Sequence, residues 1–209
     1  MPAGRIRVMI VDDHEMVRAG VAAILARQPG IAVVAEASSA HEAIRLFRTE
    51  RPDVTLLDLT MPDMDGVEAM RGIRDEFPDS RFIVLTVHCG DDDIRRALEA
   101  GAKAYLLKTA QGPELVETVR AVHAGLRHLS REVADRMNEY PVAAGLTPRE
   151  IEVLRLLPRG LSNKEIAAQL DVSETTAKWF VKNILQKLGV NDRTAAVTTA
   201  LERGILHVD

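Results

Sequence analysis

The chain has 209 residues, with 27 Lys and Arg against 31 Asp and Glu. This length allows one large domain or two small ones that each bury a core, and the composition is ordinary for a soluble protein. The single cysteine excludes an internal disulfide, and no cluster of Cys and His has the spacing of a zinc site. Without a secretory segment or an apolar run near the roughly 20 residues of a membrane span, we expect a cytoplasmic protein with no membrane partner.

The net charge of −4 is unevenly distributed. Residues 145–209 hold 9 Lys and Arg against 8 Asp and Glu, whereas residues 1–144 hold 18 against 23. The net negative charge therefore lies in residues 1–144. The back part is not basic enough to indicate nucleic-acid binding by charge alone, because that signal requires a domain pI above about 9.

Strand-like and helix-like blocks alternate over the first 125 residues. Such alternation with short connections predicts an α/β doubly wound fold, with a five-stranded parallel sheet in the order 2-1-3-4-5. The blocks are assigned from branched apolar runs and from apolar residues at helical spacing. The predicted strands are 5–11, 31–37, 54–58, 81–86 and 104–107, and the predicted helices are 16–27, 41–50, 66–76, 91–100 and 113–124.

Polar side chains stand where four of these strands end. Parallel strands bring their carboxyl ends to one edge of the sheet, so these side chains should converge. Three carboxylates that close repel one another unless a cation joins them, and oxygen ligands without His or Cys favour Mg²⁺. Taken singly, a strand-end acid is more often a turn residue or a helix cap. The converging residues are Asp12, Asp13, Asp58, Thr86 and Lys108.

This combination of groups suits phosphoryl transfer. A carboxylate can attack phosphorus to form an aspartyl phosphate, while a metal ion and an ammonium neutralise the phosphoryl oxygens and a hydroxyl donates a hydrogen bond. Asp58 is the predicted nucleophile, because Asp12 and Asp13 are adjacent and better placed to hold metal. His14 has no partner at ligand spacing and is expected to be structural or solvated.

The strand-end residues Asp12, Asp13, Asp58, Thr86 and Lys108 belong to five segments. In this order, the segments resemble the receiver domain of bacterial response regulators. The resemblance implies a CheY-like fold and phosphorylation of Asp58 by a sensor histidine kinase. It also implies that Thr86 turns toward the phosphoryl group while Tyr105 swings inward. The segments are Asp12-Asp13, Asp58-x-x-Met61-Pro62, Asp65-Gly66, Thr86 and Gly101-Ala-x-Ala-Tyr105-Leu-Leu-Lys108.

The same resemblance implies a set of metal ligands. Mg²⁺ would be bound by Asp13, by Asp58 and by the backbone carbonyl of Thr60, with Asp12 assisting through water. Lys108 and Thr86 would contact the phosphoryl group.

A connector follows the receiver-like part. Gly125 ends its last helix, Ser130 can cap a short helical segment to about Tyr140, and residues 141–145 break that segment. We therefore predict a receiver domain over 1–125, a linker over 126–144 and a second domain over 145–209.

The second domain is predicted to be all-α with four helices. Thr147-Pro-Arg-Glu150 and Ser162-Asn-Lys-Glu165 are capping boxes, and Ser173 can cap a third helix that reaches Leu188. The tight turn at 171–173 joins the second and third helices as a helix-turn-helix, and a fourth helix is predicted at about 193–203.

The third helix of this domain has two faces. Its apolar stripe begins at Ala177 and ends at Leu188, and an exposed Trp179 beside lysines lies on the far side, where surface decoration is the alternative explanation. In a helix-turn-helix the second helix enters the major groove, where Lys reaches guanine edges or phosphates. The candidate DNA contacts are Thr175, Thr176, Lys178, Trp179 and Lys182.

Four segments of the last 65 residues resemble the LuxR-type domain in the NarL/FixJ arrangement. The resemblance implies that Lys178, Trp179 and Lys182 occupy positions that usually meet bases, and that the last helix often pairs two domains on DNA. Trp179 and Phe180 depart from the usual residues and affect the choice of operator, while Pro158 should shorten the first helix. The segments are Leu146-Thr-Pro-Arg-Glu150-x-Glu-Val-Leu-x-Leu-Leu157, Gly160-x-Ser-Asn-Lys-Glu165-Ile-Ala, Thr176-x-Lys178 and Lys187-Leu-Gly-Val190.

The favoured hypothesis is a phosphorylation-controlled transcription factor and not an enzyme. Its expected partners are a sensor histidine kinase, promoter DNA and a second copy of the chain when phosphorylated or DNA-bound, with RNA polymerase as a further candidate. One alternative is a Mg²⁺-dependent phosphatase, which is disfavoured because the rim offers no second general acid or base beside Asp58. The other is a regulator that binds DNA without being phosphorylated.

Overall fold

The computed structural model describes residues 4–87, 90–130, 133–135 and 145–207. The chain divides into two compact units, the first formed by most of the residues up to Asp135 and the second by the C-terminal part, and each is described by itself. Over the described ranges, no helix is both long and apolar enough to cross a membrane.

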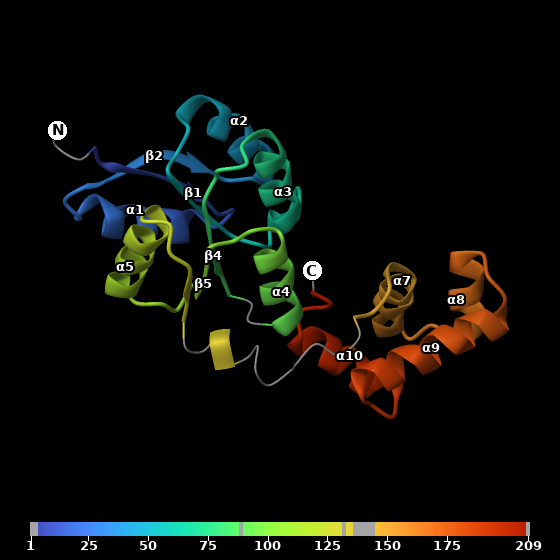
Figure 1. The fold of residues 1–209 in the computed structure, drawn as a ribbon. Coiled ribbons are helices and arrows are strands. Elements are labelled where there is room, and N and C mark those ends of the chain that lie inside the picture. The colour runs from blue at the N-terminus through green and yellow to red at the C-terminus, as the bar shows by residue number, and fades with distance from the viewer. Residues whose placement is uncertain (1–3, 88–89, 131–132, 136–144, 208–209) are drawn as a thin grey trace. The chain divides into compact units, whose positions relative to one another are not determined.

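The first unit is a parallel sheet with helices on both faces (Figure 1). The strand order is β2-β1-β3-β4-β5-β6, so the predicted order 2-1-3-4-5 is confirmed and one edge strand is added. The strands are β1 (Ile6–Val11), β2 (Ile31–Ala37), β3 (Val54–Leu57), β4 (Phe82–Thr86), β5 (Ala104–Leu107) and β6 (His128–Leu129). The helices are α1 (Glu15–Ala26), α2 (Ala40–Glu50), α3 (Gly66–Glu76), α4 (Asp91–Glu99) and α5 (Gly112–His123).

Each face of the sheet packs into its own apolar core. Successive β1 residues alternate between them, with Met9 and Val11 in the core under α2, α3 and α4, and Val8 and Ile10 in the core under α1 and α5. Strands buried on both faces read as continuous apolar runs, because parallel sheets are covered on both sides. The polar groups at the strand ends are therefore left at the edge of the sheet, where the next loop begins.

Within the described residues, the connector contains one strand that the sequence pattern did not predict. His128 and Leu129 pair in parallel with Ala104 and Tyr105 of β5. A two-residue strand is too short to show alternation, so periodicity could not reveal it. The predicted helical segment after Ser130 falls largely on residues 131–132 and 136–140, which lie outside the described residues; within it, residues 133–135 are helical.

The second unit is built from helices, as predicted. They are α7 (Pro148–Leu156), the 3-10 turn η1 (Leu157–Arg159), α8 (Asn163–Leu170), α9 (Glu174–Leu188) and α10 (Arg193–Glu202). Both predicted capping boxes are present, and Ser173 caps α9 by accepting from the Thr176 N–H. Pro158 lies in η1, so α7 ends early as expected. α8, the turn at Asp171 and α9 form the helix-turn-helix.

A buried carboxylate ties α7 to the far end of α9. Glu150 is 2% exposed, and its Oε2 accepts from the Thr147 N–H at 2.7 Å and lies 2.7 Å from the Lys187 ammonium. Burial would raise the pKa of Glu150, but the hydrogen bonds from Lys187 and Thr147 outweigh that effect and hold the pKa below its ordinary value. One side chain thus completes a helix cap and pairs with the last turn of another helix.

Glu150→Gln is expected to lower the free energy of unfolding of the second unit by about 1–3 kcal/mol, because Gln removes the charged partner of Lys187. The folded-state pKa of Glu150 lies below its unfolded value of 4.5. Its contribution is therefore present above pH 4.5 and is lost as the pH falls through the folded-state pKa. Urea unfolding followed by circular dichroism at several pH values measures both effects.

Glu152→Gln is the matched control, since Glu152 lies on the same helix with its side chain 46% exposed. It should change stability little at any pH, as exposed ion pairs contribute little. Equal effects of the two substitutions would contradict a special role for Glu150.

Candidate functional site

Three predicted residues meet at the carboxyl edge of the sheet. The Lys108 ammonium lies 2.8 Å from Asp12 Oδ2 and 2.6 Å from Asp58 Oδ2, and the two carboxylate side chains are each only 3% exposed. Burial alone would lower the pKa of Lys108, but its contacts with Asp12 and Asp58 outweigh this and raise the pKa. The lysine therefore stays charged and balances two buried carboxylates.

The backbone holds Asp58 at the end of β3. Its N–H donates to the Val11 carbonyl of β1 at 2.9 Å. Its Oδ1 receives only a long contact, 3.4 Å, from the Thr60 N–H, whereas Asp12 Oδ1 accepts from the His14 N–H at 2.9 Å. Of the two buried carboxylates, Asp58 thus has the oxygen with the weaker hydrogen bond.

The same edge has the donors that a divalent cation requires. Asp12, Asp13, His14 and Asp58 can each place one ligand atom within 4.8 Å of all the others. Asp13 Oδ1 is buried and has no hydrogen-bond partner. A buried carboxylate oxygen without a partner is costly unless a cation or water satisfies it, so this set fits an ion such as Mg²⁺. Thr60, whose carbonyl is a predicted ligand, lies exposed two residues after Asp58.

Thr86 and Tyr105 lie on the neighbouring strands β4 and β5. Thr86 ends β4 and is fully buried, and its carbonyl accepts from the Lys108 N–H at 2.8 Å. Tyr105 is also fully buried, in the core that includes Ile94 and Ala97 of α4. Thr86 is thus hydrogen-bonded to Lys108 through its backbone, and Tyr105 belongs to the same apolar core as α4.

Two further carboxylates fix the loop between β3 and α3. Asp63 accepts from the N–H groups of Ala40 and His41 at the start of α2, and its Oδ2 lies 2.7 Å from the His41 ring. Burial would raise the pKa of Asp63, but these hydrogen bonds lower it to about 2. Asp65 caps α3 by accepting from the Val67 N–H at 2.7 Å and pairs with Arg96 of α4.

α9 carries the predicted DNA contacts of the second unit. Thr175, Lys178 and Lys182 are exposed, and Trp179 is 56% exposed, with its ring and that of Phe180 in an edge-to-face arrangement. Thr176 differs, because it is partly buried and its hydroxyl is hydrogen-bonded to Ser173 at 2.8 Å. Ala177, Val181 and Ile184 are buried on the opposite face.

Sequence reasoning missed the place of His14 and the anchoring roles of Asp63 and Asp65. His14 is solvated, as expected, with 65% of its side chain exposed, but its Nδ1 lies 2.7 Å from Asp13 Oδ1. The ligand atoms of His14 and Asp58 lie within 4.8 Å of each other, and sequence reasoning did not place this ring near Asp58. Its adjacency to Asp12 and Asp13 in the sequence was the available signal.

Gly66→Ala is expected to lower the free energy of unfolding by about 1–3 kcal/mol, as overpacking does. A Cβ at Gly66 would overlap the Asp58 carbonyl oxygen and lie 2.8 Å from the Leu59 Cα, both of them backbone atoms that cannot move aside cheaply. The substitution should also weaken divalent-cation binding, because it displaces the backbone of Asp58. Chemical unfolding and calorimetric titration measure the two effects.

Gly72→Ala is the matched control on the same helix, since a Cβ there meets nothing within 4 Å. It should raise stability by about 0.5–1 kcal/mol, because Ala is the better helix former. If Gly66→Ala raised the free energy of unfolding as Gly72→Ala does, the close approach of Gly66 to the Asp58 carbonyl would not restrict the residue at position 66.

Two family models match the chain. The response regulator receiver domain matches residues 8–120, and the luxR family of bacterial regulatory proteins matches residues 144–200. The first covers the unit with Asp58, and the second covers the helix-turn-helix.

Relatives and solved structures match over nearly the whole chain. The transcriptional regulatory protein LiaR of Bacillus subtilis is 44% identical over 93% of this chain and 96% of its own, and the response regulator protein VraR of Staphylococcus aureus is 41% identical over 97% and 99%. The response regulator ChrA of a heme-sensing two-component system covers 97% of this chain and 100% of its own, with 40% identity and a TM-score of 0.58. An RcsB–DNA complex covers 95% and 99%, with 27% identity and a TM-score of 0.71. The chain belongs to the LuxR-type DNA-binding response regulators of bacterial two-component systems.

Proposed function

We propose that a sensor histidine kinase phosphorylates Asp58 and that this controls promoter binding by α9. The observation that carries the proposal is the Lys108 ammonium between Asp12 and Asp58. Asp58 attacks phosphorus through a carboxylate oxygen; an O–P bond forms, the P–N bond to the kinase imidazole breaks, and its electron pair returns to the imidazole nitrogen. Lys108 then holds charge on the phosphoryl oxygens.

Asp13, Asp58 and the Thr60 carbonyl are the proposed Mg²⁺ ligands, with Asp12 assisting through water. The unpartnered Asp13 Oδ1 supports this assignment. When bound, the cation neutralises phosphoryl charge. Asp12 remains oriented by the His14 N–H at 2.9 Å, which keeps its carboxylate at the edge of the site.

Thr86 and Tyr105 are the proposed switch. The Thr86 hydroxyl donates to the phosphoryl group, and Tyr105 stabilises the arrangement of α4 and β5 that follows. The burial of Tyr105 in the apolar core that also includes Ile94 and Ala97 of α4 supports this role. Phosphorylation then shifts an existing equilibrium between two arrangements of this face.

Promoter DNA is the proposed partner of the second unit. The exposed Thr175, Lys178, Trp179 and Lys182 would face the major groove, while the bonded Thr176 hydroxyl mainly supports the helix start. In two of the matching RcsB structures, RcsB is bound to DNA. The proposed domain bounds are 1–125 for the receiver, 126–144 for the linker and 145–209 for the DNA-binding domain.

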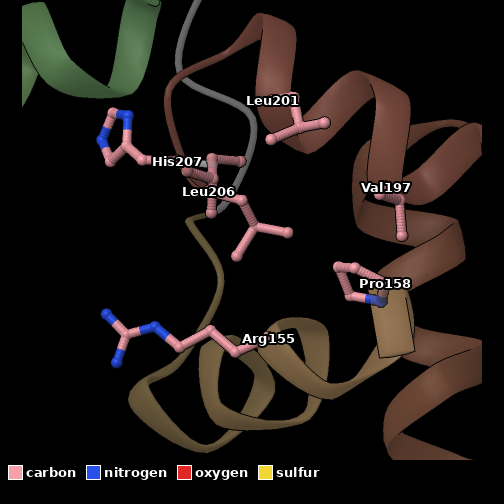
Figure 2. Close-up of a pocket in the computed structure, with 7 residues that line it drawn as sticks. Arg155, Pro158, Val197, Leu201, Leu206 and His207 are labelled. Carbon is pink, nitrogen blue, oxygen red and sulfur yellow. The ribbon is translucent and has the colours of Figure 1, made fainter. Parts of the chain in front are cut away.

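A second copy of the chain is a further proposed partner, and α10 offers a surface for it. An open pocket of about 560 Å³ lies between α7, η1 and α10. Figure 2 shows apolar side chains from these segments around it, including Pro158, Val197 and Leu201. Leu201 is 37% exposed, so pairing of two domains would bury apolar area. RNA polymerase is the remaining candidate partner.

Asp58→Asn is expected to abolish labelling by acetyl phosphate and to remove any effect of acetyl phosphate on DNA affinity, because the amide cannot form the acyl phosphate. Phosphate-affinity electrophoresis and fluorescence anisotropy with DNA measure the two effects. Asp75→Asn, an exposed acid on α3, is the control and should behave as wild type.

Two outcomes would contradict the proposal. If Asp58→Asn were still labelled, another acid would be the acceptor. If the wild type released more than one equivalent of product from small phosphate esters, and kept doing so, the chain would be a phosphatase.

Lys178→Ala and Lys182→Ala should each weaken DNA binding by about 1–3 kcal/mol if the lysines read bases. The loss should vary with sequence, because base contacts specify whereas phosphate contacts only position. Duplexes selected by the wild type from a random pool serve as probes in anisotropy titrations. Lys103→Ala, on the first unit, is the control; a Lys178 variant binding as tightly as the wild type would remove Lys178 from the interface.

A further inference from the structure

In the sequence, His14 follows the predicted metal ligands Asp12 and Asp13 and directly precedes α1. Its backbone N–H donates to Asp12 Oδ1 at 2.9 Å. Its ring Nδ1 lies 2.7 Å from Asp13 Oδ1 and 3.3 Å from Asp12 Oδ1. The imidazole nitrogen therefore lies at the acidic cluster, with its ligand atom within 4.8 Å of those of Asp12, Asp13 and Asp58.

The short approach between His14 and Asp13 has the distance of an ion pair but lacks the geometry of a hydrogen bond. Asp13 Oδ1 is buried and has no hydrogen-bond partner, although Nδ1 lies 2.7 Å away. By contrast, the His41 ring is hydrogen-bonded to Asp63 at the same 2.7 Å. A nitrogen and an oxygen that lie side by side, without pointing at each other as donor and acceptor, have the arrangement of two ligand atoms around one cation.

The His14 side chain has no other structural role among its described contacts. His14 occupies the N-cap position of α1, yet its side chain makes no capping hydrogen bond. Its ring is 65% exposed and so is not held by packing. Its recorded side-chain contacts are the approaches of Nδ1 to Asp12 and Asp13, so the ring already lies at the acidic cluster.

We propose that His14 is a nitrogen ligand of the metal centre and gives it a preference for first-row transition-metal dications over Mg²⁺. This inference rests on the metal site of the proposed function. Mg²⁺ prefers oxygen ligands and retains its waters, whereas imidazole suits transition metals such as Co²⁺ and Zn²⁺. The ligand atoms of Asp12, Asp13, His14 and Asp58 lie within 4.8 Å of one another, so one ion can reach all four.

The charges at the site are compatible with this assignment. Three carboxylates and Lys108 leave two negative charges, which a dication balances. A neutral imidazole adds a ligand bond without changing that balance. His14 therefore changes which dication is preferred more than whether a dication is bound.

The test is calorimetric titration of the full chain with Mg²⁺ and, separately, with Co²⁺. The wild type should bind Co²⁺ more tightly than Mg²⁺. His14→Gln should weaken Co²⁺ binding by about 10- to 100-fold and leave Mg²⁺ binding unchanged. The visible absorption of bound Co²⁺ should also change in the variant, because a nitrogen ligand is lost.

His41→Gln is the matched control, because His41 is similarly exposed, at 68%, and lies beside a single carboxylate. It should leave both affinities unchanged. Equal Co²⁺ affinity in His14→Gln and the wild type would overturn the inference. An equal loss of Mg²⁺ and Co²⁺ affinity would also overturn it, since His14 would then only position Asp12 and Asp13.

Asp13→Asn separates this inference from the proposed function. Loss of both metals in this variant supports the metal site whatever the His14 variant does. Retention of both metals would instead show that the site itself is wrongly placed, and the role of His14 would fall with it.

Discussion

Two buried carboxylates at one sheet edge require a cation, and Lys108 supplies it. The ammonium is 9% exposed and reaches both Asp12 and Asp58, which come from different strands. Breaking such a buried arrangement leaves an uncompensated charge, so the ends of β1, β3 and β5 must keep their positions. Adding a phosphoryl group to Asp58 would bring more negative charge to the same lysine. A change of charge at Asp58 would therefore alter the forces that hold the ends of β1, β3 and β5 together.

The loop after Asp58 is held from both sides. Asp63 ties it to the start of α2, and Asp65 ties it to the start of α3 and to Arg96 on α4. Helix N-termini favour carboxylates, so both contacts are stabilised by the backbone as well as by side chains. Gly66 then lets α3 begin against the Asp58 carbonyl. The loop after Asp58 is therefore held in one position by contacts with α2, α3 and α4.

Most of the fold could be predicted from the sequence, because apolar runs and caps report on local structure. The bounds of β2, α3 and β5 agree with their predictions, and the convergence of Asp12, Asp58 and Lys108 follows from parallel topology alone. The strand β6 could not be predicted, since two residues have no period.

Contacts between side chains that are distant in sequence could not be predicted from apolar runs and helix caps. Glu150 and Lys187 are 37 positions apart, and Asp63 meets α2 through residues 22 and 23 positions away. No local pattern relates them, because the pairing is set by how the helices pack. The orientation of His14 was missed for a different reason: spacing gives the position of a residue and not the direction of its ring.

The contact between Glu150 and Lys187 also constrains the orientation of α9. Lys187 lies in the last turn of α9, and Thr175 lies near its start, about 18 Å away at 1.5 Å per residue. A tilt of α9 by roughly 10° about that end would move the start of the helix by about 3 Å. That displacement is comparable to the length of a hydrogen bond. The contact of the buried Glu150 carboxylate with Lys187, together with the buried Ala177, Val181 and Ile184, therefore limits how far the exposed face of α9 can tilt.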